Sequence, residues 1–185
     1  MALRQILTEP NPILRQKSLN VEAVDKDLQK LMDDMLETMY AAPGIGLAAI
    51  QVGVPKRVIV LDIGLRDESE DTNNEKQVVK KNPMYFVNPE IITKSINNST
   101  YEEGCLSVPG QFAEIERPDK CHIKYLNYYG EPKELVAEGM LATCIQHEMD
   151  HLEGILFIDY LSKLKKSMIV KKLTKQKEQL DRIVI

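Results

Sequence analysis

His147 and His151 stand four residues apart in the sequence, and Glu148 directly follows the first of them. Four residues make about one turn of an α-helix, so both imidazoles would project from one helix face and could bind one metal ion. Glu148 would lie beside that face, where a carboxylate can take a proton from a bound water without becoming a ligand. Because two of the chain's three histidines fall in this pattern, it favours a metal-dependent hydrolase.

Two histidines leave a catalytic metal one protein ligand short. Cys144 lies seven residues from His151, about 10 Å along a helix axis, so we expect it to line the pocket rather than share the metal. Cys121 and His122 are neighbours in a strand-like run and point to opposite faces, which makes them a weaker alternative. Cys105 stands in a turn-prone stretch after a short strand and is the best third ligand by elimination.

Two other functions share the helix motif. A metalloprotease of the extended kind would need a third histidine where this chain has Phe157. Another protease class would need a glutamate ligand downstream, for which the chain offers Glu153 at the helix end or Glu178 in a lysine-rich tail. A structural zinc module would need a fourth protein ligand and would leave Glu148 without a role. The sequence favours the open, catalytic kind of site over both.

Gly44, Gly46 and Ala49 also match the Gly-x-Gly-x-x-Ala spacing of a dinucleotide site, with Asp62 downstream. That fingerprint requires a strand before it and a helix after it. Here a methionine-rich helix precedes the glycines, and Gly53 interrupts soon after them. The context therefore rejects a dinucleotide site.

Three stretches have the apolar spacing of helices. The first runs from Val24 to Tyr40 and stops before Pro43. The second, Gly139–Gly154, carries the two histidines and ends at a glycine suited to a helix C-terminus. The third begins at a plausible Ser162 cap and reads as a lysine-rich surface helix.

The middle of the chain is rich in short β-type segments separated by turn signals. We predict a loop over residues 44–51, a strand from Arg57 to Asp62, and a polar excursion without chemistry over residues 64–82. The further predicted strands are Tyr85–Ile92, Ser99–Glu102, Phe112–Glu116, Cys121–Leu126 and Glu134–Ala137. Together these elements predict one α+β domain over residues 1–185, with mostly antiparallel sheets around a central metal-binding helix, N-terminal and C-terminal helices, and residues 162–185 as a surface extension.

The composition limits the class of protein. With 43% hydrophobic and 28% charged residues, the 185-residue chain resembles an ordinary globular domain. No apolar run approaches the roughly 20 residues of a membrane span, and the N-terminus lacks a secretory signal, so we expect a cytoplasmic protein. Three irregularly spaced cysteines predict no disulfide partner. The net charge of -4 gives no general attraction to nucleic acid, although seven lysines lie between residues 163 and 177.

Three segments resemble the signature motifs of peptide deformylases: GIGLAAIQ at residues 44–51, EGCLS at 103–107 and QHEMDHLEG at 146–154. They occur in the right order, and the resemblance extends from the N-terminal helix to the C-terminal helix. It implies an enzyme of the bacterial type that removes the formyl group from the N-terminal formylmethionine of newly made polypeptides and releases formate.

The resemblance also implies a metal site. In that family the cysteine of the second motif and both histidines of the third bind one divalent ion, which here means Cys105, His147 and His151, the set that elimination reached. The ion would lower the pKa of a bound water and so provide hydroxide as the nucleophile. Two imidazoles and a thiolate suit Zn²⁺, Fe²⁺, Ni²⁺ or Co²⁺, and the family implies Fe²⁺ in the cell.

The family assigns roles to residues around the metal. Glu148 would take the water proton and pass it to the leaving amine, and the side-chain amide of Gln51 and the backbone N–H of Leu106 would bind the oxyanion. Ile45 and Gly46 would lie alongside the substrate backbone. The apolar slot for the methionine side chain is expected to include Tyr101, Leu141, Cys144 and His147.

The resemblance is less direct at four other places. Glu103 is expected at the substrate site, where it would pair with Arg117 and brace the Cys105 loop. The chain has Phe112 where many relatives have an arginine facing the peptide, and Thr143 where an apolar residue is common. The basic C-terminal helix resembles the extension by which bacterial relatives dock on the ribosome.

Overall fold

The computed structural model describes residues 2–64 and 80–183. The α-helices within these ranges are α1 (Lys26–Ala41), α2 (Gly139–Leu152) and α3 (Lys163–Ile183), and the 3-10 helices are η1 (Pro12–Arg15), η2 (Ala49–Val52) and η3 (Phe157–Tyr160). The strands are β1 (Gly46–Ala48), β2 (Val58–Leu61), β3 (Met84–Lys94), β4 (Asn98–Cys105), β5 (Val108–Pro118), β6 (Lys120–Leu126) and β7 (Pro132–Glu138). None of the described helices is long and apolar enough to cross a membrane.

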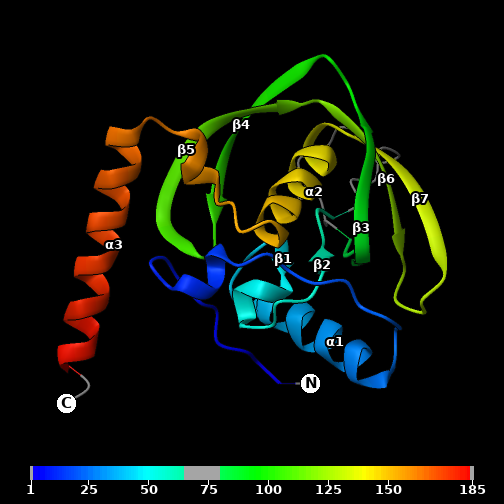
Figure 1. Cartoon of the computed structure of the whole chain (residues 1–185), viewed down its shortest axis with the longest axis horizontal. Coiled ribbons are helices and arrows are strands. Elements are labelled where there is room, and N and C mark those ends of the chain that lie inside the picture. The colour runs from blue at the N-terminus through cyan, green and yellow to red at the C-terminus, as the bar shows by residue number, and fades with distance from the viewer. Residues whose placement is uncertain (1, 65–79, 184–185) are drawn as a thin grey trace, which may run out of the picture.

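The strands form two antiparallel sheets (Figure 1). One has five strands in the order β1-β2-β3-β6-β7, and the other is the two-stranded hairpin of β4 and β5. Helix α2 contacts strands of both sheets. The predicted α+β fold with a central helix is therefore confirmed, and α2 is placed to carry side chains into the space between the sheets.

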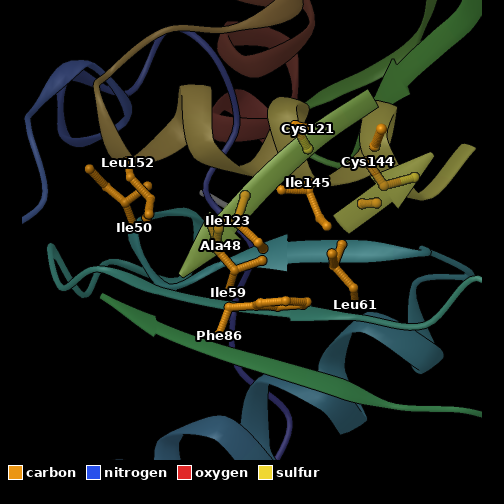
Figure 2. Close-up of a cluster of buried hydrophobic side chains, with 12 residues drawn as sticks. Ala48, Ile50, Ile59, Leu61, Phe86, Cys121, Ile123, Cys144, Ile145 and Leu152 are labelled. Carbon is orange, nitrogen blue, oxygen red and sulfur yellow. The ribbon is translucent and has the colours of Figure 1, made fainter. Parts of the chain in front are cut away.

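Strand β2 is buried on both faces, which explains its continuous β-branched and leucine sequence. Val58 and Val60 pack with α1, whose buried methionines and leucines form its inner face. Ile59 and Leu61 point to the opposite side and pack with Ile145 of α2, in the cluster that Figure 2 shows. The two helices therefore cover opposite faces of the five-stranded sheet.

Helix ends follow local chemistry. Asp25 caps α1 because its side chain accepts a hydrogen bond from the Leu28 N–H at 2.8 Å. Beyond the end of α2, Gly154 has φ +75°, and a Cβ there would lie 2.5 Å from the backbone oxygen of Arg15. Only glycine fits that junction, so this residue ends the metal-binding helix and lets the N-terminal segment pack against it.

Helix α3 stands at one side of the molecule (Figure 1). The predicted Ser162 cap is present, with Oγ accepting from the Lys165 N–H at 3.3 Å. Leu173 is buried in a cluster with Val108 and Phe157. Leu164 and Met168 are 72% and 63% exposed, so the first turns of α3 face solvent and its middle turns attach it to the rest of the molecule.

The structure extends or corrects several predictions. The five predicted strands after residue 84 are confirmed, each longer than its sequence signal. The loop predicted over residues 44–51 is wrong for residues 46–48, which pair with β2 as the edge strand β1 before η2 begins. Small residues gave no strand signal there, because the pairing partner lies a dozen residues away. Of the predicted excursion over residues 64–82, positions 65–79 lie outside the described residues.

Candidate metal centre

Cys105, His147 and His151 meet between the two sheets. One ligand atom from each lies within 4.8 Å of the others, and Cys105 Sγ is 3.2 Å from His151 Nε2. Metal bonds of about 2.3 Å to sulfur and about 2.0 Å to nitrogen separate two ligand atoms by about 3.5 Å in a tetrahedral site. The three residues therefore fit one metal ion with only a small adjustment.

Two different elements deliver these ligands. Both histidines project from the same face of α2, as the four-residue spacing predicts. Cys105 ends β4, where the register with β5 shifts between Gly104 and Cys105 so that Cys105 pairs with Val108. Such an irregularity re-aims a side chain at the end of a hairpin, and here it turns the thiol toward the helix.

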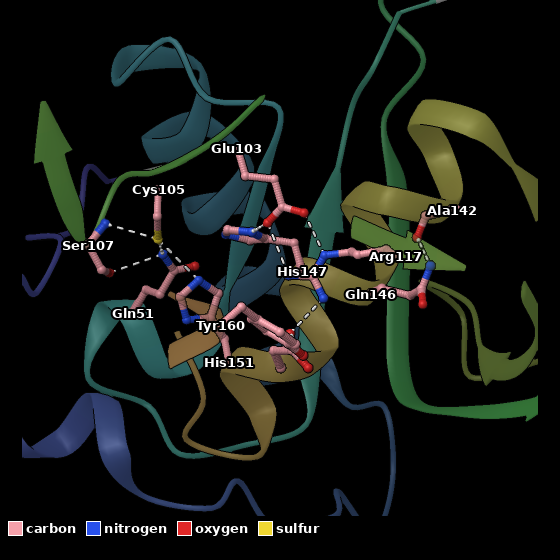
Figure 3. Close-up of polar contacts among 11 residues, drawn as sticks. Gln51, Glu103, Cys105, Ser107, Arg117, Ala142, Gln146, His147, His151 and Tyr160 are labelled. Atoms are coloured by element: carbon pink, nitrogen blue, oxygen red, sulfur yellow. Dashed lines mark hydrogen bonds and ion pairs between the residues drawn. The ribbon is translucent and has the colours of Figure 1, made fainter. Parts of the chain in front are cut away.

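A buried ionic network orients His147 (Figure 3). Glu103 Oε2 lies 2.8 Å from His147 Nδ1, and Arg117 contacts both Glu103 oxygens at 2.5 and 3.0 Å. Arg117 also donates to Asp150 Oδ2 at 2.8 Å. Burial raises the pKa of Glu103, but the hydrogen bonds from His147 and Arg117 lower it more, so the carboxylate is ionised. The network leaves Nε2 of His147 as the nitrogen available to a metal.

Glu148 is buried at 5% exposure beside the ligands, and its Oε2 has no hydrogen-bond partner among the described residues. Burial raises the pKa of its carboxyl to about 7, with His147 opposing the rise and Glu103 adding to it. A Cβ at Gly46 would collide with the carboxylate. The glycine thus allows Glu148 to lie against the backbone of β1, with a pKa suited to proton transfer at neutral pH.

Gln51 is not the solvated loop amide that its position in a loop would suggest. It is 1% exposed, its Oε1 accepts from the Ala48 N–H at 2.8 Å, and its Nε2 donates to Ser107 Oγ at 3.0 Å. The same Nε2 lies 3.6 Å from Cys105 Sγ. These contacts fix the amide with its N–H groups directed toward the metal centre (Figure 3).

The ligands border a pocket of about 620 Å³. The predicted site residues that line it are Ile45, Gly46, Gln51, Tyr101, Glu103, Cys105, Leu106, Cys144, His147 and Glu148. His151 lies behind this wall, buried at 1% exposure. Burial raises the pKa of the Cys144 thiol to about 12, with Glu148 and Glu103 adding to the rise, so this cysteine is a neutral part of the wall.

Leu141 was expected in this slot, but it does not line the pocket and packs against the core cluster around Ile145 instead. Thr143 and Cys144, one turn before His147, line the pocket together with Met140, which lies about two turns before it. A helix turns about 100° per residue, so neighbouring positions such as 140 and 141 face different surroundings, and the sheet packed on α2 decides which faces inward.

Sequence reasoning missed two contributors to the site. Ser107 is fully buried between Gln51 and Cys105, and its backbone N–H lies 3.4 Å from the Cys105 sulfur. Asp150 Oδ2 accepts a hydrogen bond from Nη1 of Arg117, the same guanidinium that pairs with Glu103. A serine two residues after a ligand and an aspartate inside the histidine motif were the available signals, but neither spacing reveals a partner distant in sequence.

The alternative ligands lie elsewhere. His122 faces out of β6 and contacts Glu134 at 2.9 Å, while Cys121 is buried in the core cluster of the five-stranded sheet. Glu153 makes ion pairs with Lys17 and Arg57 at 2.9 and 2.5 Å. Within residues 2–64 and 80–183, the group of Cys105 and the two histidines is the one that meets the geometric requirement for a metal.

Comparisons with known proteins agree with this centre. The family model described as "Polypeptide deformylase" matches residues 3–167. A peptide deformylase of Pelagibacter ubique (strain HTCC1062) is 63% identical over 185 residues, covering 100% of both chains, and one of Maricaulis maris (strain MCS10) is 58% identical over 182 residues, covering 98% of both. The crystal structure of peptide deformylase from Ehrlichia chaffeensis in complex with actinonin is similar with a TM-score of 0.86 at 41% identity, covering 95% of this chain and 98% of that one.

Proposed function

The chain belongs to the polypeptide deformylase family, and we propose that Cys105, His147 and His151 hold its catalytic metal while Glu148 moves the proton. As a member of that family it is a metal-dependent hydrolase, which removes the formyl group from the N-terminal formylmethionine of nascent polypeptides and releases formate. The convergence of the three ligands beside a buried, partly unpaired glutamate is the observation that supports the residue assignment.

The donor set fits a divalent ion of borderline softness, and we propose Fe²⁺ as the ion bound in the cell. When bound, such an ion supplies a nucleophilic water at neutral pH and polarises the formyl oxygen. Glu103 and Arg117 keep His147 in the orientation and tautomer that ligation needs. Zn²⁺, Ni²⁺ or Co²⁺ would fit the same donors in purified protein.

Glu148 serves as the proton carrier. Its carboxyl is buried beside the metal ligands and has one oxygen without a hydrogen-bond partner among the described residues, so it can accept a proton from water and return it to the leaving amine. The backbone of Gly46 lies directly against this carboxylate and limits its movement. Both steps therefore occur at one fixed position in the pocket.

Gln51 and Leu106 stabilise the oxyanion that forms at the formyl carbon. The Gln51 amide is held by Ala48 and Ser107, so its N–H groups do not reorganise during the reaction. Leu106 lines the pocket directly after the ligand cysteine, which brings its backbone N–H near the reacting carbon. Removing one such donor typically costs about 10² to 10³ in rate.

The substrate backbone lies extended between the edge strand β1, near Ile45 and Gly46, and the edge of β4. Each of these strands is at the edge of its sheet in the described structure, and both border the pocket. An extended peptide can therefore add its hydrogen bonds to either edge. The methionine side chain then enters the slot lined by Tyr101, Met140 and Cys144.

The experiment is formate release from formyl-Met-Ala-Ser by anaerobically purified enzyme, compared with Glu148→Gln. We expect the variant to lose about 10² to 10⁴ in kcat while keeping its metal content, because only the proton carrier is removed. Glu153→Gln, on the surface just beyond α2, is the matched control and should keep its rate. Backbone cleavage of the unformylated peptide without formate release would instead indicate a protease.

The basic side of α3 is proposed as a ribosome-docking surface, and the cytoplasm, where nascent chains emerge, as the location. Its lysines at 163, 165, 171, 172, 175 and 177 are exposed, as are Leu164 and Met168. Changing Lys171, Lys172 and Lys175 to glutamate should abolish co-sedimentation with ribosomes and leave formate release from a free peptide unchanged. Undiminished co-sedimentation of the triple variant would exclude this surface.

A further inference from the structure

Asp62 directly follows β2 and is buried at 7% exposure. Its carboxylate accepts hydrogen bonds from the Tyr40 hydroxyl, from the Gly64 N–H at 2.7 Å and from the Asn82 N–H at 3.1 Å. A carboxylate removed from water needs such donors, and hydrogen bonds to a carboxylate are among the stronger ones in proteins. Asp62 therefore connects the last turn of α1 to the end of β2 and to the residues that lead into β3.

The backbone of Asp62 holds one edge of the pocket. Its N–H donates to the Ile45 carbonyl at 2.9 Å, which continues the β1–β2 pairing of Gly46 with Leu61 by one residue. Hydrogen-bonded and non-hydrogen-bonded pairs alternate in an antiparallel ladder, so the N–H and C=O of Gly46 point away from β2. They face the outer edge of β1, where Ile45 and Gly46 line the pocket. Asp62 thus fixes the direction of the backbone groups that a substrate can reach.

Residues 42–45 connect α1 to β1 and line the pocket. At the start of this segment the Gly44 N–H donates to a carbonyl in the last turn of α1 at 2.9 Å, and at its end the Ile45 carbonyl accepts from Asp62. Tyr40 lies in the last turn of α1, so its hydroxyl joins the first end of the segment to the second. Ile45 is 48% exposed, so burial contributes little to holding it. The Tyr40–Asp62 hydrogen bond therefore acts as a brace across the segment.

The ring and the hydroxyl of Tyr40 are both held in place. Lys81 Nζ lies 4.0 Å from the centroid of the ring, the distance of a cation–π contact. Burial raises the pKa of the Tyr40 hydroxyl, and the hydrogen bond to Asp62 raises it further, so the group stays protonated and remains a donor at neutral pH. Neither Tyr40 nor Asp62 lines the pocket. Both therefore act on a substrate only through the segment that they hold.

Building on the proposed function, we propose that Tyr40 and Asp62 are positioning residues for the substrate backbone. Their hydrogen bond keeps residues 42–45 in place, so that Gly46 presents its N–H and C=O to the pocket before a peptide arrives. Without the brace the segment must be ordered when the peptide binds, and the apparent affinity falls in proportion to the fraction of molecules in the competent arrangement. The chemical step is little affected, because β1 stays paired with β2 and Gly46 still lies against Glu148.

The test measures kcat and KM separately for formate release from formyl-Met-Ala-Ser. Tyr40→Phe removes only the hydroxyl, and we expect KM to rise about tenfold, the lower end of the range for one hydrogen bond to a charged group, with kcat within about twofold. Tyr128→Phe is the matched control and should keep both constants, because its hydroxyl donates at 3.1 Å to Asp33 of the same helix, and neither of these residues lines the pocket. A loss of folded enzyme alone would lower kcat and leave KM unchanged.

Asp62→Asn and Asp62→Ala are the second pair of variants. Asparagine keeps an oxygen that accepts from Tyr40 and from the backbone, so KM should stay close to that of the wild type, whereas alanine should raise KM at least as much as Tyr40→Phe does. Tyr40→Phe decides the question by itself if Asp62→Ala does not fold.

An unchanged KM in Tyr40→Phe would overturn the brace and leave the proposed function intact, since the wild type would still release formate. A lower kcat as the only change would overturn it equally, because it would indicate a structural role alone. Absence of formate with the wild-type enzyme would overturn the proposed function, and this inference with it.

Discussion

The missing side chain of Gly46 determines where Glu148 can lie. A Cβ at this position would collide with the Glu148 carboxylate and would come 2.7 Å from Leu61 Cδ2. Since Leu61 belongs to the packed core, neither neighbour can move freely. A Cβ at Gly44 would also make a close contact, at 2.8 Å from the end of the Leu106 side chain. This contact is easier to relieve than the one at Gly46, because the end of a leucine side chain can rotate away.

Gly46→Ala should therefore lower kcat by about tenfold or more, because a displacement of the proton carrier by about 1 Å can cost two orders of magnitude. Metal content should be unchanged, since the atoms nearest to the added methyl group belong to Glu148 and Leu61 rather than to a metal ligand. Gly44→Ala should cost less, because the Leu106 side chain can rotate away. Steady-state formate release with metal analysis checks both variants, and equal losses in the two would contradict this account.

Arg117 links three elements. It extends from β5 to Glu103 on β4 and to Asp150 on α2, and it is only 4% exposed. The pair with Glu103 is buried on both sides, so removing the arginine leaves an uncompensated buried carboxylate. Through Glu103 this link also holds His147, so the orientation of the hairpin on the helix and the geometry of the metal centre depend on one guanidinium.

We expect Arg117→Met to reduce the free energy of unfolding by about 3 to 5 kcal/mol, the usual effect of breaking a buried ion pair from one side. Metal affinity should fall about 10- to 100-fold, because the partner that orients His147 is no longer held. Lys124→Met removes the exposed pair with Glu90 and serves as the control, with an effect below about 1 kcal/mol. Denaturant unfolding and metal titration measure the two effects, and equal stability of the two variants would refute the role of Arg117.

Helix α3 contributes to the whole molecule through a cluster that reaches the metal centre. Leu173 is 3% exposed and packs in the cluster of Val108, Phe157 and Ile158, against which Cys105 is also packed. Asp159 of η3 holds the start of α3 through Lys166 at 2.5 Å and the N-terminal region through Arg15 at 2.6 Å. The C-terminal helix thus supports the Cys105 loop as well as facing solvent.

Leu173→Ala should destabilise the enzyme by about 2 to 4 kcal/mol, because it removes a buried side chain and leaves a cavity. Leu164→Ala changes the same residue type on the same helix at 72% exposure and should cost less than about 0.5 kcal/mol. Thermal unfolding of the two variants distinguishes them. If neither variant changed the unfolding temperature, α3 would be only loosely attached, and the idea that it supports the Cys105 loop would be wrong.

Local patterns in the sequence determined much of this protein. The four-residue histidine spacing, the helical apolar periods and the five strands after residue 84 are all short-range signals, and elements of those types are present. The cysteine was reached by excluding ligands whose spacing could not fit. Such inferences succeed because helix and strand periods are properties of the backbone itself.

Only the tertiary structure decided the contacts between distant segments. It turned residues 46–48 into an edge strand, replaced Leu141 by Met140 in the pocket wall, and joined Gln51 to Ser107. Each outcome depends on which surfaces pack together, and that is set by burial summed over the whole chain rather than by any local pattern. The sequence therefore determined the reacting groups, whereas packing determined their orientation, their pKa values and the shape of the pocket.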